Sequence, residues 1–197
     1  MLATVPLARA QQAMPHQPVG TLQLAVQVCA ACHGIDGNSP RGDIPSLAGQ
    51  VDAYLEGQLH AFAAQGGQRV SGIMGAMAVN LSPGEMKRLA NYFSHQVLRS
   101  TPSTDARLAS RGQEIFFAGV PGSGVAACAS CHGVRGEGLP DLFPRLAGQH
   151  ARYVVMQLQY FRAGRRTSDP RAMMRELAAR LSDRDIEAVA EYVASLR

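Results

Sequence analysis

The stretch Cys29-Ala30-Ala31-Cys32-His33-Gly34 decides the fold of this chain, and Cys128-Ala129-Ser130-Cys131-His132-Gly133 repeats it 99 positions later. These four cysteines are the only ones among the 197 residues. In each copy two thiols stand three residues apart and an imidazole follows at once. Such a group can bind a metal, exchange a disulfide or hold a larger group through both sulfurs, and its surroundings decide among the three.

The repeat continues on the C-terminal side of both motifs. Residues 29–50 read CAACHGIDGNSPRGDIPSLAGQ and residues 128–149 read CASCHGVRGEGLPDLFPRLAGQ, with Pro45 matching Pro144. Further along, apolar positions recur in threes and fours, which predicts two equivalent amphipathic helices. The matching positions are Tyr54, Leu55, Gln58, Leu59 and Phe62 against Tyr153, Val154, Gln157, Leu158 and Phe161. The chain therefore contains two copies of one structural unit.

Each copy ends in another predicted helix, which begins after a serine. Ser82-Pro83-Gly84-Glu85 is a capping box with proline at the first helical position, and Ser182-Asp183-Arg184-Asp185 is its acidic variant. A buried apolar stripe follows each cap, with Met86, Leu89, Ala90 and Phe93 in the first copy and Ile186, Val189, Ala190 and Val193 in the second. No alternating run predicts a substantial strand, so the expected fold class is all-α.

These patterns divide the chain into four parts. We expect domains over residues 19–97 and 107–197, joined by a linker over residues 98–106, where Ser, Thr, Pro and charged residues show no apolar period. Residues 1–18 are interpreted as the remainder of a secretory leader, because Ala8-Arg9-Ala10 has the A-x-A pattern that signal peptidase cuts. A plain disordered N-terminus is the alternative. The leader predicts export to the periplasm.

Hydropathy and charge argue against a membrane-spanning segment and against nucleic-acid binding. No apolar run reaches the roughly 20 residues that span a bilayer as a helix, so we expect no integral membrane segment and at most a peripheral association with the membrane. The formal net charge is +4, yet Lys and Arg are spread along the chain without a block of five or more. Nucleic acid is therefore not an expected partner.

Haem attachment explains the doubled motif best. Tetrahedral zinc needs ligands close together, whereas a complete repeat separates Cys32 from Cys128 and the adjacent histidines would have no role. A thioredoxin-type dithiol needs a strand-to-helix turn, and no strand is predicted. In a c-type haem motif each cysteine forms a thioether with the porphyrin, and the histidine reaches the iron. We expect two covalently attached haem c groups, held by Cys29 and Cys32 and by Cys128 and Cys131, with His33 and His132 as iron ligands.

The repeat also sorts the candidates for the second axial ligand. Among the methionines within the copies, only Met74 and Met174 occupy matching places, seven residues before Leu-Ser. We place both after an irregular loop rather than inside a helix, and interpret Met77, Met86 and Met156 as packing residues. The remaining histidines, His16, His60, His95 and His150, have no matching histidine in the other copy. The expected axial pair is His and Met at both irons, a pairing that raises the reduction potential.

The chain resembles the dihaem cytochromes of the cytochrome c4 family. The likeness covers about residues 20–197 and rests on the two haem motifs, the PSLAGQ and FPRLAGQ segments and the two Met-x6-Leu-Ser segments. It implies two class I cytochrome c domains related by a pseudo-twofold axis. It also implies that Pro45 and Pro144 offer backbone carbonyls to Nδ1 of the two motif histidines and thereby orient each ring. The short loop before Met74 and the positively charged second domain depart from the family pattern, which leaves partner identity open.

The resemblance implies electron transfer as the function. We expect a periplasmic carrier between a respiratory donor, either a quinol-oxidising complex or a dehydrogenase, and a terminal oxidase. Two alternatives are a permanent cytochrome subunit of a dehydrogenase complex and an enzyme, such as a dihaem peroxidase or a thiosulfate-oxidising cytochrome. An enzyme needs one iron with an exchangeable or unusual ligand, so methionine at both irons favours a protein without catalysis.

Overall fold

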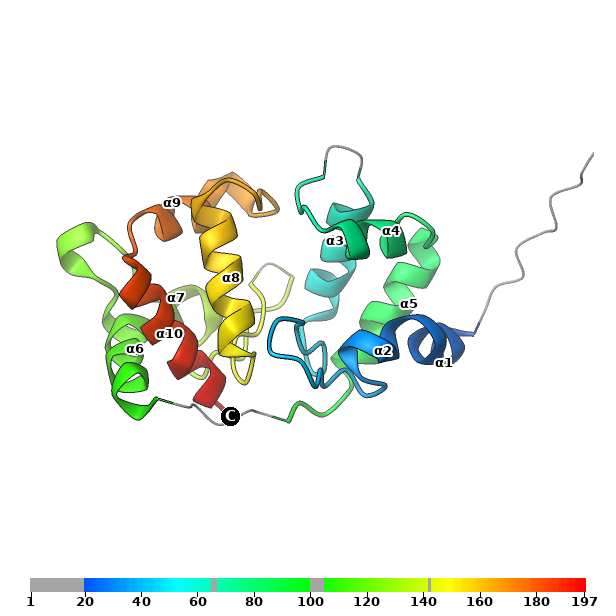
Figure 1. Ribbon diagram of the computed structural model, residues 1–197, viewed down its shortest axis with the longest axis horizontal. Helices are drawn as coiled ribbons and strands as arrows, with labels where there is room; N and C mark the ends of the chain where they lie inside the picture. The colour runs from blue at the N-terminus through cyan, green and yellow to red at the C-terminus, as the bar shows by residue number, and fades with distance from the viewer. Residues whose placement is uncertain (1–19, 65–66, 100–104, 142) are drawn as a thin grey trace, which may run out of the picture.

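The computed structural model describes residues 20–64, 67–99, 105–141 and 143–197. Within these ranges the regular structure is helical, and β-type pairing is limited to isolated bridges. Figure 1 shows two groups of helices side by side, α1–α5 from the first half and α6–α10 from the second. The predicted all-α fold is confirmed. The predicted leader over residues 1–18, His16 included, lies outside the described residues.

The helices follow the order that the repeat predicts. In the first half, α1 (Thr21–Leu24), a π-helical turn (Ala25–Cys29) and α2 (Ala30–His33) run on without a break, followed by α3 (Asp52–Ala63), α4 (Gly72–Ala78) and α5 (Pro83–Ser94). The second half contains α6 (Ala106–Ala118), α7 (Ala129–His132), α8 (Ala151–Arg162), α9 (Met173–Ala179) and α10 (Asp183–Ser195). Single 3₁₀ turns cover Pro121–Ser123 and Pro170–Ala172.

The two closing helices begin and pack as the sequence predicts. Ser82 and Glu85 form a complete capping box at the start of α5, and the Ser182 side chain accepts a hydrogen bond from the Asp185 amide at the start of α10. The predicted stripes are buried: Met86, Leu89, Ala90, Phe93, Ile186, Val189, Ala190 and Val193. Met77 is 42% exposed, so its interpretation as a packing residue is wrong, because α4 buries only Ala78.

The halves differ ahead of their haem motifs. In the first half the helix runs directly into Cys29, whereas α6 ends at Ala118 and a loop closed by a bridge between Val120 and Val125 leads to the second motif. This loop is an insertion that the repeat pattern did not reveal. Helix α6 begins at Ala106, one residue before the predicted domain start, and residues 100–104 of the predicted linker lie outside the described ranges.

In the second half, helices α6 and α10 cross at very short distance. Gly112 of α6 lies against α10, and a Cβ atom added there would overlap the carbonyl oxygen of Ala188. Only glycine allows the two backbones to approach this closely.

Equivalent residues meet in pairs where the two halves join. The Gln50 side chain donates from Nε2 to the Arg145 carbonyl oxygen at 2.9 Å and accepts from the Arg145 amide at 2.7 Å. Gln149 holds Ser46 in the same way. In Figure 1, α3 and α8 flank this junction. These reciprocal contacts agree with the expected pseudo-twofold arrangement.

Candidate haem sites

The first cysteine motif lies on a continuous helical turn. Cys29 ends the π-helical turn, and α2 carries Cys32 and His33. Both cysteines are half-buried and form no disulfide. Gly34 ends α2 with φ at 76°, and a Cβ atom there would overlap the carbonyl oxygen of Asn38. Glycine therefore lets the chain turn immediately after the histidine.

The first motif histidine is fixed by a backbone carbonyl. His33 is 7% exposed, and its Nδ1 lies 2.9 Å from the Pro45 carbonyl oxygen. Since a carbonyl can only accept, Nδ1 carries the proton and Nε2 is left with a free lone pair. Burial lowers the pKa of His33 although the Pro45 hydrogen bond acts in the opposite direction. The ring is thus held neutral, the form that binds a metal.

The second motif repeats this geometry. His132 is also 7% exposed, and its Nδ1 lies 2.9 Å from the Pro144 carbonyl oxygen. Gly133 follows with φ at 84°. The rings of Phe143 and His132 lie edge to face, with ring centres 6.0 Å apart. The two motif histidines are therefore held in the same way.

The thiols have the properties of attachment points. Burial raises the pKa of Cys29 and of Cys128 to about 11. Both are neutral at physiological pH, whereas redox-active cysteines sit where the thiolate is favoured. In the described ranges no three His, Cys, Asp or Glu side chains gather into a metal-ion site. These observations favour thioether attachment over dithiol exchange and over zinc.

The two methionines occupy matching places, although their local structure differs from the prediction. Met74 lies in the first turn of α4, where Ser71 Oγ accepts from its amide at 3.2 Å, and Met174 lies in the first turn of α9. The placement outside a helix is therefore wrong, because each short helix begins just before its methionine. Met174 packs with Cys128 against the core of the second half. Ligation of the irons by Met74 and Met174 stays a prediction.

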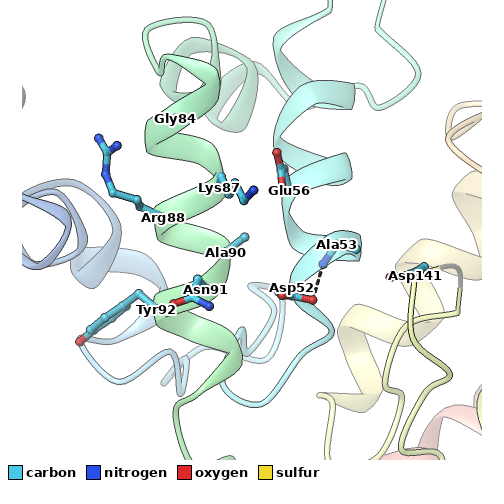
Figure 2. Close-up of a pocket in the computed structure, with 10 residues that line it drawn as sticks. All are labelled: Asp52, Ala53, Glu56, Gly84, Lys87, Arg88, Ala90, Asn91, Tyr92 and Asp141. Atoms are coloured by element: carbon cyan, nitrogen blue, oxygen red, sulfur yellow. Dashed lines mark hydrogen bonds between the residues drawn. The ribbon is translucent and has the colours of Figure 1, made fainter.

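A groove of about 740 Å³ lies apart from both motifs, between α3 and α5. Figure 2 shows Glu56 and Lys87 facing each other across it, with Asp141 of the second half at one side. No motif cysteine or histidine and neither candidate methionine lines this groove.

The sequence prediction missed a polar cluster between the two halves. Its members, here called the arginine cluster, are Arg69, Arg166, Tyr54, Tyr153, Gln58 and Gln157. A signal was present in the sequence, since a glutamine occurs at the same place on each otherwise apolar helical stripe.

Comparison with known proteins agrees with this geometry. Residues 22–96 and 109–197 match the family described as Cytochrome c. Cytochrome c4 of Pseudomonas aeruginosa is 40% identical over 176 residues, 88% of this chain and 86% of that protein. Reduced recombinant cytochrome c4 from Pseudomonas stutzeri has a solved structure with a TM-score of 0.83 and 41% identity, covering 87% of this chain and 95% of that one. A thiosulfate dehydrogenase electron acceptor of Thiomonas intermedia is 35% identical over 170 residues, 85% of this chain and 77% of that protein.

The fold and the two sites define a c-type cytochrome with two covalently attached haem c groups, a protein of electron transfer rather than an enzyme. The chain belongs to the cytochrome c4 family. Among the helices of the described residues, none has the length and apolar character needed to cross a membrane.

Proposed function

We propose that this cytochrome carries electrons in the periplasm from a quinol-oxidising complex or a dehydrogenase to a terminal oxidase, with at most a peripheral association with the membrane. Haem c, when bound, supplies reversible one-electron exchange at its iron. His33 and Met74 are the proposed axial ligands of the first iron, and His132 and Met174 those of the second. Ligation on both faces leaves no coordination position for a substrate.

One observation carries the proposal. The prolines whose carbonyls hold the two motif histidines are each followed directly by a residue that bonds to the other domain. Ser46 follows Pro45 and is bonded to Gln149 at 2.9 and 3.0 Å. On the other side Arg145 follows Pro144 and is bonded to Gln50. Both irons are thus held from one shared interface, which suits passage of an electron between two sites of fixed separation.

The surface beside the two motifs is suited to short-lived complexes with redox partners. Apolar side chains are exposed beside the first motif, Val28 at 41% and Ile35 at 47%, and beside the second, Val134 at 64%. Ile73, next to Met74, is 70% exposed. Such scattered apolar contacts suit small interfaces that dissociate quickly.

A second candidate is the permanent cytochrome subunit, or dedicated electron acceptor, of a dehydrogenase. The 35% identity to a thiosulfate dehydrogenase electron acceptor favours this candidate specifically. It uses the same two sites and differs only in the docking partner.

A stopped-flow experiment separates the candidates. The oxidised cytochrome is mixed with membranes that contain a quinol-oxidising complex and quinol, or with thiosulfate dehydrogenase and thiosulfate. The carrier proposal expects rapid reduction by the membranes, rapid reoxidation by oxidase-containing membranes, and separate elution from the dehydrogenase on gel filtration. Reduction by the dehydrogenase alone, with co-elution, would establish the second candidate instead.

The chain's processing belongs to the same proposal. We place the mature start after Ala10 and the domains at residues 19–97 and 107–197, joined by residues 98–106. Intact mass and N-terminal sequencing of the exported protein test the cleavage site.

A further inference from the structure

The loop ahead of Met174 contains two strained residues. Arg171 and Ala172 have φ angles of 53° and 60°, so two successive residues adopt the left-handed conformation. A residue with a Cβ atom rarely takes this conformation, because the Cβ atom then crowds the backbone. Ala172 is also the N-cap residue of α9, which begins at Met173. Backbone strain therefore lies directly before the helix that carries the second candidate methionine ligand.

A buried carboxylate closes this loop. Asp169 precedes the two strained residues, and Arg175 directly follows Met174. The Asp169 carboxylate accepts from Arg175 Nε at 2.9 Å and from the Arg175 backbone amide at 3.0 Å. The Asp169 side chain is 3% exposed, the lowest exposure of any carboxylate among the ion pairs of the described residues. Because a buried charge that loses its partner is left uncompensated, this pair is more costly to break than an exposed one.

Asp169 also replaces a missing helix cap. The first amides of a helix have no acceptor within the helix, and a Ser, Thr, Asp or Asn side chain at the N-cap usually accepts from one of them. Ala172 has no such side chain. Asp169 supplies the acceptor from three residues further back along the chain. Its two bonds thus join the ends of the segment 169–175, with the strained residues and Met174 between them.

The first half holds its methionine by other means. Ser71, the N-cap residue of α4, has an extended backbone, and its hydroxyl accepts from the Met74 amide at 3.2 Å. Gly72 occupies the position that matches Ala172. Residues 70–81 contain no charged side chain, so no ion pair can form there. The strained loop and its ion pair are therefore specific to the second half and are not a requirement of the repeated fold.

We propose that Asp169 is a positioning residue for the second haem, which acts through Arg175 to hold Met174 on the iron against the strain of the preceding loop. Met174 packs beside Cys128 and is joined directly to Arg175, so its place depends on this segment. The strain favours release of the methionine and the ion pair opposes it. This inference rests on ligation of the second iron by Met174, which belongs to the proposed function.

The rate at which the methionine leaves the iron tests the proposal. The oxidised two-haem protein is mixed with imidazole, which can bind to an iron only after the methionine has left. At saturating imidazole the observed rate is therefore the rate of methionine release. Met174→Ala identifies the phase that belongs to the second haem, because its rate should no longer saturate with imidazole. Urea unfolding of each variant records global stability in parallel.

The two main variants should change release in opposite directions. Asp169→Asn keeps the shape of the side chain but removes its charge, so release from the second haem should become about tenfold faster or more. Ala172→Gly should slow this release about two- to fivefold, because glycine takes a positive φ without steric cost. Release from the first haem should stay unchanged in both variants. General weakening of the domain cannot slow release, so the glycine variant separates positioning from a merely structural role.

Matched controls exist for both changes. Asp183→Asn removes a carboxylate that is 72% exposed and paired with Arg162 in the same half, and it should leave both release rates within about twofold of the parent. Ala163→Gly changes an exposed alanine whose φ is −84°, where there is no left-handed strain to relieve, and it should not slow release.

The outcomes separate this inference from the proposed ligation. Unchanged release from the second haem in Asp169→Asn, or equal changes at both haems, overturns the proposal. If Asp169→Asn does not accumulate with both haems, Ala172→Gly decides: slower release supports the proposal, and unchanged or faster release refutes it. Two saturating phases in Met174→Ala would instead refute ligation by Met174, and this inference with it.

Discussion

The side-chain amide of Gln149 bonds both backbone groups of Ser46, the residue that follows the carbonyl holding His33. Its Oε1 accepts from the Ser46 amide at 3.0 Å, and its Nε2 donates to the Ser46 carbonyl at 2.9 Å. The Gln149 side chain thus satisfies the N–H and the C=O of Ser46, as the backbone of a paired strand would. Domain docking therefore acts directly on the loop that orients His33.

Gln149→Ala should loosen the domain interface. It removes the two partly buried hydrogen bonds to the Ser46 backbone, and also the one that Oε1 accepts from the His150 amide. Leaving the Ser46 backbone groups without these partners should cost about 1–3 kcal/mol. Urea unfolding and small-angle X-ray scattering should show lower stability and a more extended average shape. Gln113→Ala, at an exposed position of α6, is the control and should behave as the parent. Equal stability and shape in both variants would show that the amide does not hold the domains.

Met174→Ala should open one coordination position at the second iron. The far-red absorption of the methionine–iron bond should fall by about half, one of two ligated haems, and the potential of that haem should drop. Carbon monoxide should then bind to the reduced second haem, while the first haem keeps its spectrum. Met77→Leu, at an exposed position of α4, should change none of these. Undiminished far-red absorption in Met174→Ala would remove Met174 from the ligand set.

Gly112→Ala should destabilise the second domain. The new methyl group would overlap the Ala188 carbonyl oxygen, so α6 and α10 must separate, at a cost of about 1–3 kcal/mol or more. Gly122→Ala is the matched control, because nothing lies within 4 Å of a Cβ atom added there. Thermal unfolding followed by circular dichroism compares the two. Similar midpoints in the two variants would mean that the crossing adapts without loss.

Asp185 should contribute to the acid sensitivity of the fold. The Ser182 hydroxyl, which donates to the carboxylate at 2.6 Å, is the main cause that lowers the pKa of Asp185, and Arg111 adds to the effect. A lowered pKa in the folded state means that the carboxylate stabilises the fold above the unfolded pKa of about 3.9. This stabilisation is lost as the pH falls through the folded pKa.

Asp185→Asn should therefore be less stable than the parent at pH 7 and should lose less stability on acidification to about pH 2. Urea unfolding across this range measures both effects. Glu187→Gln, an exposed position of the same helix, should keep the parent's acid profile. An Asp185→Asn profile as steep as the parent's would exclude this carboxylate as a cause.

Local signals predicted most of the fold. The offset between copies, 99 positions up to the loops and 100 after them, paired the helices. Ser82 and Ser182 predicted the start of α5 and α10 because capping chemistry depends only on neighbouring residues. The helical placement of Met74 was missed because α4 has seven residues, too few for an apolar period to show. The loop ahead of Cys128 was missed because the copies do not correspond there.

The arginine cluster could not be predicted from local patterns. Arg69 and Arg166 are offset by 97 positions, unlike the 99 of the motifs, so the repeat does not align them. Their pairing forms only when the two domains dock. A buried guanidinium with neutral acceptors is a property of the assembled interface, and a single sequence records only that two loops contain arginine.

The fuller core of the second half makes the symmetry of this molecule incomplete. Ile115 and Phe116 of α6 are fully shielded from solvent, and the described core of the second half has eleven buried members against six in the first. Amide protons of α6 and α10 should consequently be the last to exchange with deuterated water, while the first haem's surroundings open more often. Two sites built on one pattern would then experience different rates of local fluctuation, which distinguishes them even where their iron environments match.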